Sequence, residues 1–271
     1  MIPAPFAYHR AGSVDEALAL LAEHGEDAKL LAGGHSLLPM MKLRFAFPSV
    51  LVDVGRLAET SYIRVEGDEV AVGATTRHAD VARSEVLAAE APLLRIVAGY
   101  VGDPQVRHRG TLGGSLSHAD PAADLPAAVV ASDATLIVAG SNGRRSVAAA
   151  DFFTGYLETA LAPDEMLVEV RVPHTGPTGA HYEKFTRRAN DWAIVGVATV
   201  GGRVALVNMG DRPLRATATE QALAEGASVA DAAALAAEGT SPGTDMHGDD
   251  TYRRHLARVL TRRALEAAAT S

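Results

Sequence analysis

The chain has 271 residues, no cysteine and a formal net charge of −8 at pH 7. The lack of cysteine excludes disulfides, cysteine-ligated zinc sites and iron–sulfur clusters held by this chain. The negative net charge, without a block of like charges, argues against a nucleic-acid-binding surface and against a polybasic membrane surface. Charged residues interrupt the N-terminal segment, so we expect no secretion signal and a cytoplasmic protein.

A small α/β unit is predicted over residues 1–56. Ser13 and Glu16 form a capping box, in which each side chain binds a backbone amide near the other residue, so a helix begins there. Apolar runs bounded by turn residues predict strands, and the second of these runs into the pair Gly33-Gly34. The predicted strands span residues 6–10, 28–32 and 50–54.

A second unit is predicted over residues 57–173. Alternating apolar and polar residues on both sides of Gly67-Asp68 predict a hairpin. Asp103-Pro104 is expected to break the chain, and the pair Gly113-Gly114 is expected to form a second glycine turn. The predicted strands span residues 62–65, 69–72, 135–138 and 166–172, and helical stretches are predicted from Thr76 and over residues 89–98.

A third unit is predicted over residues 174–271, after a linker rich in proline and glycine at residues 173–179. Gly201-Gly202 predicts a tight turn between two strands of an antiparallel meander. Apolar residues at helical spacing predict helices after the meander. The predicted strands span residues 180–186, 193–200 and 203–209, and the predicted helices span residues 216–225, 230–238 and 249–268.

The two glycine pairs share a pattern. Each follows an apolar run and precedes a serine by no more than two residues, as Gly33-Gly34-His35-Ser36 and Gly113-Gly114-Ser115. Consecutive amides exposed in such turns, together with a serine hydroxyl, suit an anionic oxygen, and two facing turns would suit a diphosphate. The alternative is that both are only tight turns. Neither of the glycine-rich motifs of dinucleotide-binding and P-loop folds is present.

Four segments resemble a known family. They are KLLAGGHSLLPMMKLR (residues 29–44), RHRGTLGGSLSHADPAADLP (107–126), YEKFTRRANDWAIVG (182–196) and DDTYRRHLARVLTRRAL (249–265). Together they resemble the FAD-binding medium subunit of aerobic, molybdenum-containing carbon monoxide dehydrogenases and, more widely, the flavin subunit of the xanthine dehydrogenase family. The resemblance covers nearly the whole chain in order.

The resemblance implies an α+β fold with two α/β FAD-binding subdomains of the PCMH type and a C-terminal domain with a three-stranded antiparallel sheet and helices. It implies FAD on this chain, with a molybdopterin cofactor on a large molybdenum-binding subunit and [2Fe-2S] clusters on a small iron–sulfur subunit. Electrons would pass from the clusters to FAD and then to a quinone, NAD or oxygen. The complex would lie in the cytoplasm or at the inner face of the membrane.

The resemblance also implies which residues hold FAD. The two glycine segments would bind the diphosphate mostly through backbone amides, Asp124 would bind ribose or ribityl hydroxyls, and Leu167 would pack against the adenine. The residues assigned to the cofactor are Leu30, Leu31, Ala32, Gly33, Gly34, His35, Ser36, Leu37, Gly102, Val106, Gly110, Thr111, Gly113, Gly114, Ser115, His118, Asp124, Leu167, Lys184, Asp191 and Trp192. No catalytic side chain and no metal ligand is predicted on this chain, because the flavin would carry the chemistry.

Several alternatives stay open from the sequence. Trp192 is either a flavin neighbour or a core or interface aromatic, and contact of Lys184 with the flavin ring is undecided. His118, Asp120 and Asp124 lack a recognised metal-ligand spacing, and Asp120 before Pro121 is a candidate N-cap or a ligand-binding residue.

The function also has alternatives at this point. The whole complex could instead hydroxylate an aldehyde, nicotinate or a purine. The chain itself could be a nucleotide-binding scaffold without redox turnover, or a free-standing flavin reductase.

Overall fold

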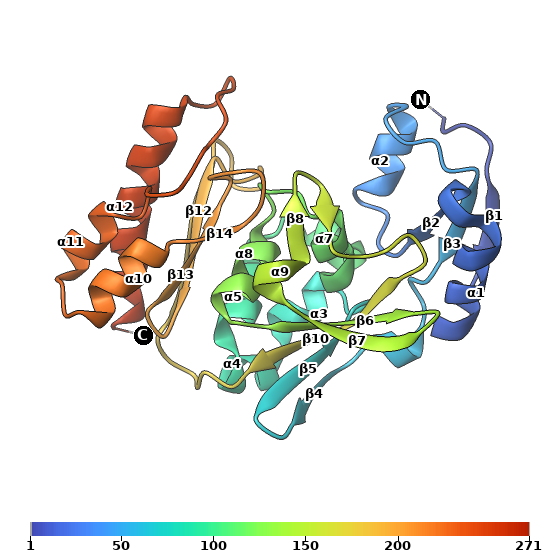
Figure 1. Ribbon diagram of the computed structural model, residues 1–271, viewed down its shortest axis with the longest axis horizontal. Coiled ribbons are helices and arrows are strands. Elements are labelled where there is room, and N and C mark those ends of the chain that lie inside the picture. Colours follow the sequence, from blue (N-terminus) through green and yellow to red (C-terminus); the bar gives the residue numbers. More distant parts are fainter. Residues whose placement is uncertain (1, 271) are drawn as a thin grey trace.

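The computed structural model describes residues 2–270, and within them the strands form four sheets (Figure 1). Three sheets follow one another along the long axis of the molecule, in the order in which they occur along the chain. The fourth is the short pair β8 (Phe153–Gly155) and β9 (Glu158–Thr159).

The first part of the chain forms a three-stranded parallel sheet, called the parallel sheet below. Its elements are β1 (Ala7–Arg10), α1 (Val14–His24), β2 (Ala28–Leu31), α2 (Leu37–Lys42) and β3 (Val50–Asp53), with the strands in the order β1-β3-β2. The Ser13 side chain accepts from the amide of Glu16, as predicted, and the Glu16 carboxylate accepts from the amide of Gly12 at 2.7 Å. Ala17 and Leu21 of α1 are buried against the sheet. Helix α2 was not predicted.

The middle of the chain forms an antiparallel sheet, called the five-stranded sheet below. Its strands, in spatial order, are β4 (Ile63–Glu66), β5 (Glu69–Gly73), β10 (Met166–Pro173), β6 (Thr135–Gly140) and β7 (Gly143–Ala148). The predicted hairpin at Gly67-Asp68 is confirmed by the pairing of β4 with β5. Strand β7 escaped prediction because most of its side chains are exposed, so its sequence has no apolar alternation.

Several short helices accompany the five-stranded sheet. They are α3 (His78–Arg83), α4 (Glu85–Glu90), α5 (Pro92–Tyr100), α6 (Pro104–Arg109), α7 (Leu112–His118), α8 (Asp124–Ala131) and α9 (Ala149–Phe152), with 3-10 turns at Gly25–Asp27 and Ala58–Thr60 elsewhere in the chain. The helical stretch predicted over residues 89–98 is divided at Ala91, because Pro92 starts a new helix.

The predicted break at Asp103-Pro104 is present, because α5 ends at Tyr100 and a new helix, α6, begins at Pro104. Asp103 is the N-cap of α6 and accepts from the amide of Val106 at 2.9 Å, while Pro104 occupies the first turn. Proline is compatible with that position because its missing N–H has no partner there in any case.

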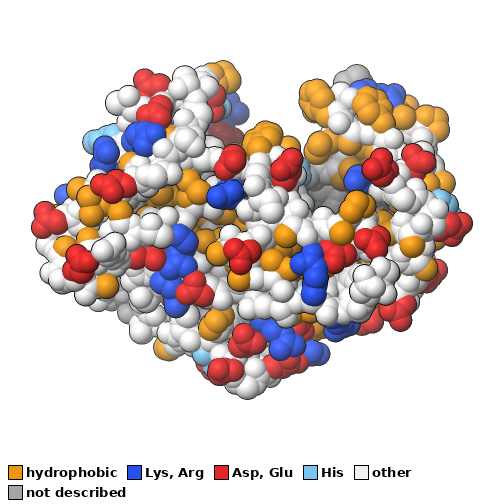
Figure 2. Space-filling view, viewed as in Figure 1, with side chains coloured by type: hydrophobic (Ala, Val, Ile, Leu, Met, Phe, Trp, Pro, Cys, Tyr) orange, Lys and Arg blue, Asp and Glu red, His pale blue; other side chains and the backbone are white. Residues whose placement is uncertain are grey.

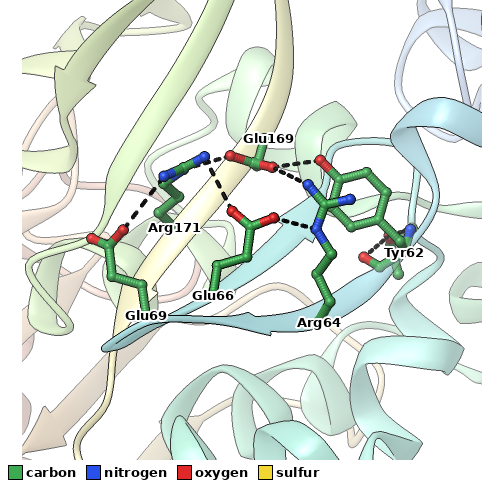
Figure 3. Close-up of polar contacts among 7 residues, drawn as sticks. Tyr62, Arg64, Glu66, Glu69, Glu169 and Arg171 are labelled. Atoms are coloured by element: carbon green, nitrogen blue, oxygen red, sulfur yellow. Dashed lines mark hydrogen bonds and ion pairs between the residues drawn. The ribbon is translucent and has the colours of Figure 1, made fainter.

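Charged residues form a network on the face of the five-stranded sheet opposite the core (Figure 3). Val70, Val72 and Val170 face the core, so the residues that alternate with them on β5 and β10 point to the other side. There the Glu169 carboxylate accepts from Tyr62 Oη at 2.5 Å and from Arg171 Nε at 2.6 Å. Burial and the Glu169 contact raise the pKa of Tyr62 to about 12, so the network stabilises the sheet with Tyr62 as a neutral donor.

The last part of the chain forms an antiparallel sheet, called the four-stranded sheet below. Its strands, in order, are β11 (Ala180–Phe185), β12 (Val195–Val200), β13 (Arg203–Val207) and β14 (Leu214–Arg215), and its helices are α10 (Thr217–Ala224), α11 (Val229–Ala234) and α12 (Asp250–Ala268). The predicted three strands and three helices are present. Strand β14 adds a fourth strand, which is too short to give a periodic pattern.

Two helices lie between the five-stranded and four-stranded sheets. α5 contacts β11, and α8 contacts both β12 and β13, while α12 packs on the other side of the four-stranded sheet (Figure 1). Leu125 of α8 shares one core with Leu136 of β6 and Val207 of β13. This shared core fixes the residues of β11 relative to those that follow β5. Among residues 2–270, no helix combines the length and the apolar character that crossing a bilayer would require.

Candidate cofactor-binding site

A cavity of about 1170 Å³ lies between the parallel sheet and the five-stranded sheet, and residues from β11 and the loop after it form a third wall. Figure 2 shows the surface hollowed between the part at the right, which contains the parallel sheet, and the centre of the molecule. Small-molecule sites have typical volumes of about 300–1,000 Å³. The cavity therefore has room for a large ligand such as a dinucleotide.

Every residue that the resemblance assigned to the cofactor lines this cavity. The parallel sheet contributes residues 30–37, the segment after β5 contributes residues 102–124, and β10 contributes Leu167. Lys184, Asp191 and Trp192 come from the last part of the chain. The fold thus brings together residues that are far apart in the sequence, and their contact with FAD stays a prediction.

The first glycine segment, residues 32–37, leaves β2 as a true turn. Gly34 has φ +75°, a conformation that favours glycine. A Cβ on Gly33 would lie 2.5 Å from the carbonyl oxygen of Arg109 and 2.8 Å from Cα of Gly110, so glycine permits two backbone segments to touch. Within residues 2–270, no acceptor is found for the backbone amides of residues 33–37. These amides line the cavity and suit an anionic ligand.

The second glycine segment, residues 110–115, is not the turn that was predicted. Thr111 is the N-cap of α7 and its hydroxyl accepts from the amide of Gly114 at 3.1 Å, so both glycines lie in the first turn of a helix. The amide of Gly113 donates to the carbonyl of Ala74 at 2.8 Å. A Cβ on Gly113 would lie 2.6 Å from that of Ala74, so this glycine serves the packing of α7 against the end of β5.

Two serine hydroxyls remain available in the glycine segments. Ser36 and Ser115 both line the cavity, and neither side chain has a hydrogen-bond partner in the part of the chain that the structure describes. His35 is exposed, and its Nδ1 lies 3.2 Å from the carbonyl oxygen of Gly33, which fits its predicted role as a turn residue. The two segments therefore differ in what they offer: amides and a hydroxyl in the first, and a hydroxyl in the second.

A buried ion pair forms the wall near the four-stranded sheet. Lys184 Nζ lies 2.9 Å from Asp124 Oδ2, with both side chains about 95% buried, and donates to the carbonyl of Tyr100 at 3.3 Å. Tyr182 Oη donates to Asp124 Oδ1. Burial raises the pKa of Asp124 while Lys184 and Tyr182 act against that rise, and burial and Asp124 raise the pKa of Tyr182 well above its usual value. Both Asp124 oxygens thus already have a protein donor.

Leu167 and Trp192, two apolar residues of the cavity wall, differ widely in the exposed fraction of their side chains. Leu167 of β10 is 4% exposed and belongs to the core shared by the two larger sheets, while Trp192 is 58% exposed in the loop before β12. The exposure of Trp192 excludes the core alternative for this side chain. Its indole is free to contact a ligand or a partner protein.

Of the two alternatives for Asp120, the N-cap with Pro121 in the first turn of a helix is excluded by the structure. Asp120 Oδ1 accepts from the amide of Ala122 at 2.9 Å in a turn, and α8 begins only at Asp124. The N-cap of α8 is Ala123, whose side chain cannot accept a hydrogen bond. The first residue of the helix, Asp124, is buried. No group of three or more potential metal ligands is found within residues 2–270.

Sequence reasoning missed many residues that line the cavity, among them Phe47, Thr75 and His78. Thr75 and His78 follow the end of β5, and Phe47 follows α2. No motif marks them in the sequence. Their role becomes visible only when the sheet order places the end of β5 beside the first glycine segment.

Comparisons with known proteins agree with this architecture. The family model described as the FAD binding domain in molybdopterin dehydrogenase matches residues 4–175, and the CO dehydrogenase flavoprotein C-terminal domain matches residues 180–268. The chain is 44% identical to the carbon monoxide dehydrogenase medium chain of Hydrogenophaga pseudoflava, over 99% of this chain and 98% of the relative. It is 35% identical to the glyceraldehyde dehydrogenase medium chain of Sulfolobus acidocaldarius, over 99% of this chain and 100% of the relative.

Among solved structures, a chain of the Hydrogenophaga pseudoflava carbon monoxide dehydrogenase that lacks the Mo-pyranopterin moiety superposes with a TM-score of 0.95. The two chains are 45% identical in sequence, and the match covers 100% of this chain and 99% of the other. The fold, the cavity and both family matches lead to one assignment. The chain belongs to the family of FAD-binding flavoprotein subunits of molybdopterin dehydrogenases.

Proposed function

We propose that this chain is the FAD-carrying subunit of a molybdenum-containing carbon monoxide dehydrogenase. The observation that carries the proposal is the first glycine segment, whose unpaired amides line a cavity large enough for a dinucleotide. The similarity to a carbon monoxide dehydrogenase medium chain over the full length supports the substrate of the complex. Bound FAD would accept electrons from a partner subunit and pass them to an external acceptor.

The amides of the first glycine segment bind the FAD diphosphate. Gly34, His35 and Ser36 present consecutive N–H donors that need no compensating charge, because backbone amides stabilise an anion as neutral dipoles. The Ser36 and Ser115 hydroxyls add donors from the two sides of the cavity. Glycine at position 33 keeps the two segments close enough to share one diphosphate.

The ion pair of Asp124 and Lys184 orients the cofactor farther along the cavity. Its charges compensate each other, so a neutral ring system can lie against it without facing an isolated buried charge. Each Asp124 oxygen accepts one protein hydrogen bond and keeps a further lone pair for a ribose or ribityl hydroxyl. Trp192 packs beside the isoalloxazine, where an exposed aromatic ring excludes water from one face.

The electron donors lie on other chains. This chain has no cysteine, so [2Fe-2S] clusters are supplied by a small iron–sulfur subunit, and the molybdenum cofactor belongs to a large subunit. FAD held on this chain would supply the redox chemistry, with a quinone, NAD or oxygen as the external acceptor. An aldehyde, nicotinate or purine hydroxylase is the alternative complex, since the chain is 35% identical to a glyceraldehyde dehydrogenase medium chain and 36% identical to a caffeine dehydrogenase subunit beta.

The test is to express the chain with its partner subunits and to follow the flavin absorbance anaerobically. We expect stoichiometric FAD that is bleached on addition of carbon monoxide to the complex and left oxidised when this chain is isolated. Bleaching by an aldehyde and not by carbon monoxide would support the alternative complex. A chain that copurifies with its partners without flavin would contradict the flavin assignment and leave the nucleotide-binding scaffold.

A further inference from the structure

His78 is a histidine of the cavity wall that the function above leaves without a role. It lies in the first turn of α3, is 4% exposed, and its backbone amide donates to the carbonyl of Gly110 at 3.0 Å. A Cβ built on Gly110 would lie 2.8 Å from His78 Nε2, and Gly110 in turn adjoins Gly33. The imidazole therefore sits where the two glycine segments meet.

The imidazole is neutral. Burial, with smaller contributions from the nearby His35, Arg77 and Arg107, lowers the pKa of His78 to about 4. A neutral imidazole carries one proton, on either Nδ1 or Nε2. Nδ1 is fully buried and has no hydrogen-bond partner among residues 2–270. A proton there would be a buried donor without an acceptor, which native proteins rarely tolerate.

The proton therefore belongs on Nε2. This atom has no hydrogen-bond partner in the described part of the chain, and it is not among the enclosed unpartnered atoms of the structure. Because His78 lines the cavity, Nε2 is the nitrogen that a ligand can reach. The result is a neutral N–H donor beside the unpaired amides of the first glycine segment.

We propose that His78 binds the diphosphate of FAD through Nε2–H, as a fixed neutral donor between the two glycine segments. The inference rests on the proposed FAD-binding function and adds a side chain to it. The surroundings favour an anion, since Arg77 and Arg107 lie near the imidazole and bind backbone carbonyls. Within residues 2–270 neither guanidinium forms a direct ion pair with a carboxylate. Burial lowers the pKa of Arg77, and Asp53 and Asp80 oppose this only through longer-range attraction. A protonated His78 imidazole would be repelled by these arginines, so the site accommodates the neutral imidazole as the donor.

Three variants of the full chain, expressed with its partner subunits, test the proposal. His78→Gln places an amide donor at the reach of Nε2, His78→Asn places it at the reach of Nδ1, and His78→Phe removes it. We expect the dissociation constants of FAD and of ADP to rise at least about tenfold for His78→Phe and His78→Asn, which is the loss of one hydrogen bond to a charged group. His78→Gln should stay within about threefold of wild type.

The outcomes separate this inference from the proposed function. If the wild-type complex binds no FAD, the proposed function fails. If the wild-type complex binds FAD, and His78→Phe binds both FAD and ADP as tightly as wild type, only the role of His78 is refuted. That role is also refuted if His78→Phe binds FAD more weakly than wild type but binds ADP as tightly.

A second measurement does not require a folded variant. In wild-type protein labelled with ¹⁵N-histidine, one neutral imidazole should carry its proton on Nε2, and that proton resonance should move when ADP is added. An Nδ1–H tautomer at His78, or a resonance that ADP leaves unchanged, would overturn the proposal.

Discussion

The two glycine segments have similar sequences and different structures. Gly33-Gly34 forms a turn after β2, with φ +75° at Gly34 and amides that have no acceptor in the described residues. Gly113-Gly114 lies in the first turn of α7, where Thr111 and Ala74 accept the amides. The difference arises from Thr111, which caps a helix in the second segment. A pair of glycines thus indicates close packing, and only the neighbouring residues decide whether the amides are available.

The structure also gives a different reason why glycine occupies these positions in the two segments. The sequence suggested that both pairs form turns that expose amides to a diphosphate. In the structure, a Cβ on Gly33 would clash with the backbone of Arg109 and Gly110, and a Cβ on Gly113 would clash with Ala74. The glycines therefore hold parts of the fold together first, and ligand binding follows from that arrangement.

Gly33→Ala should have the largest effect. Its Cβ would come within 2.5 Å of a backbone oxygen, and neither segment can yield without opening the cavity wall. We expect a loss of about 3 kcal/mol in the free energy of unfolding, as for severe overpacking, together with loss of FAD. Thermal unfolding and flavin content measure the two effects. A variant of wild-type stability that still binds FAD would show that the two segments do not need to touch.

Gly113→Ala should lower stability by about 1–3 kcal/mol, because α7 must move away from Ala74. The FAD affinity of the folded variant should fall less than that of Gly33→Ala, since the amide of Gly113 is already bound to a protein carbonyl. Denaturant unfolding and FAD titration at low temperature separate these effects. Equal losses of affinity in both variants would mean that the segments act alike.

Ser115→Ala should leave stability unchanged and raise the dissociation constant of FAD about tenfold, the effect of one hydrogen bond to a phosphate. The Ser115 hydroxyl is the donor that the second segment has available, because the Ser115 amide already donates to the carbonyl of Thr111 at the start of α7. Equilibrium titration measures the change, and Ser146→Ala, at an exposed position of β7 that does not line the cavity, is the control. No difference between these two variants would remove the second segment from the diphosphate site.

His35→Ala should have the smallest effect, below about twofold in FAD affinity. The exposed side chain makes its one hydrogen-bond contact among residues 2–270 within its own turn, while the contribution to binding comes from its amide, which alanine keeps. A loss of tenfold or more would show that the first segment binds through a side chain, against the contrast drawn here.

Much of the fold was predictable because the strands of the core have apolar runs or alternation. The hairpin around Gly67-Asp68, the capping box at Ser13 and the three-helix end of the chain follow from local rules that packing did not override. The missed elements lack such signals. β7 is mostly exposed, and β14 has only two residues.

The residues of the cavity wall could be predicted but their local geometry could not, and their contact with FAD stays a prediction. All the assigned residues line one cavity, which the family resemblance made possible. The helix at Gly113-Gly114 was missed because glycine disfavours helices, a preference that the Thr111 cap and the contact with Ala74 override. His78 was missed because its position depends on sheet order, which no short motif encodes.

The central claim is that the first glycine segment holds the FAD diphosphate through its amides. A high-resolution structure of the complex with FAD bound tests this most directly. We expect phosphate oxygens within about 2.7–3.2 Å of the amides of Gly34, His35 and Ser36. A diphosphate bound elsewhere, with these amides facing only water, would contradict it.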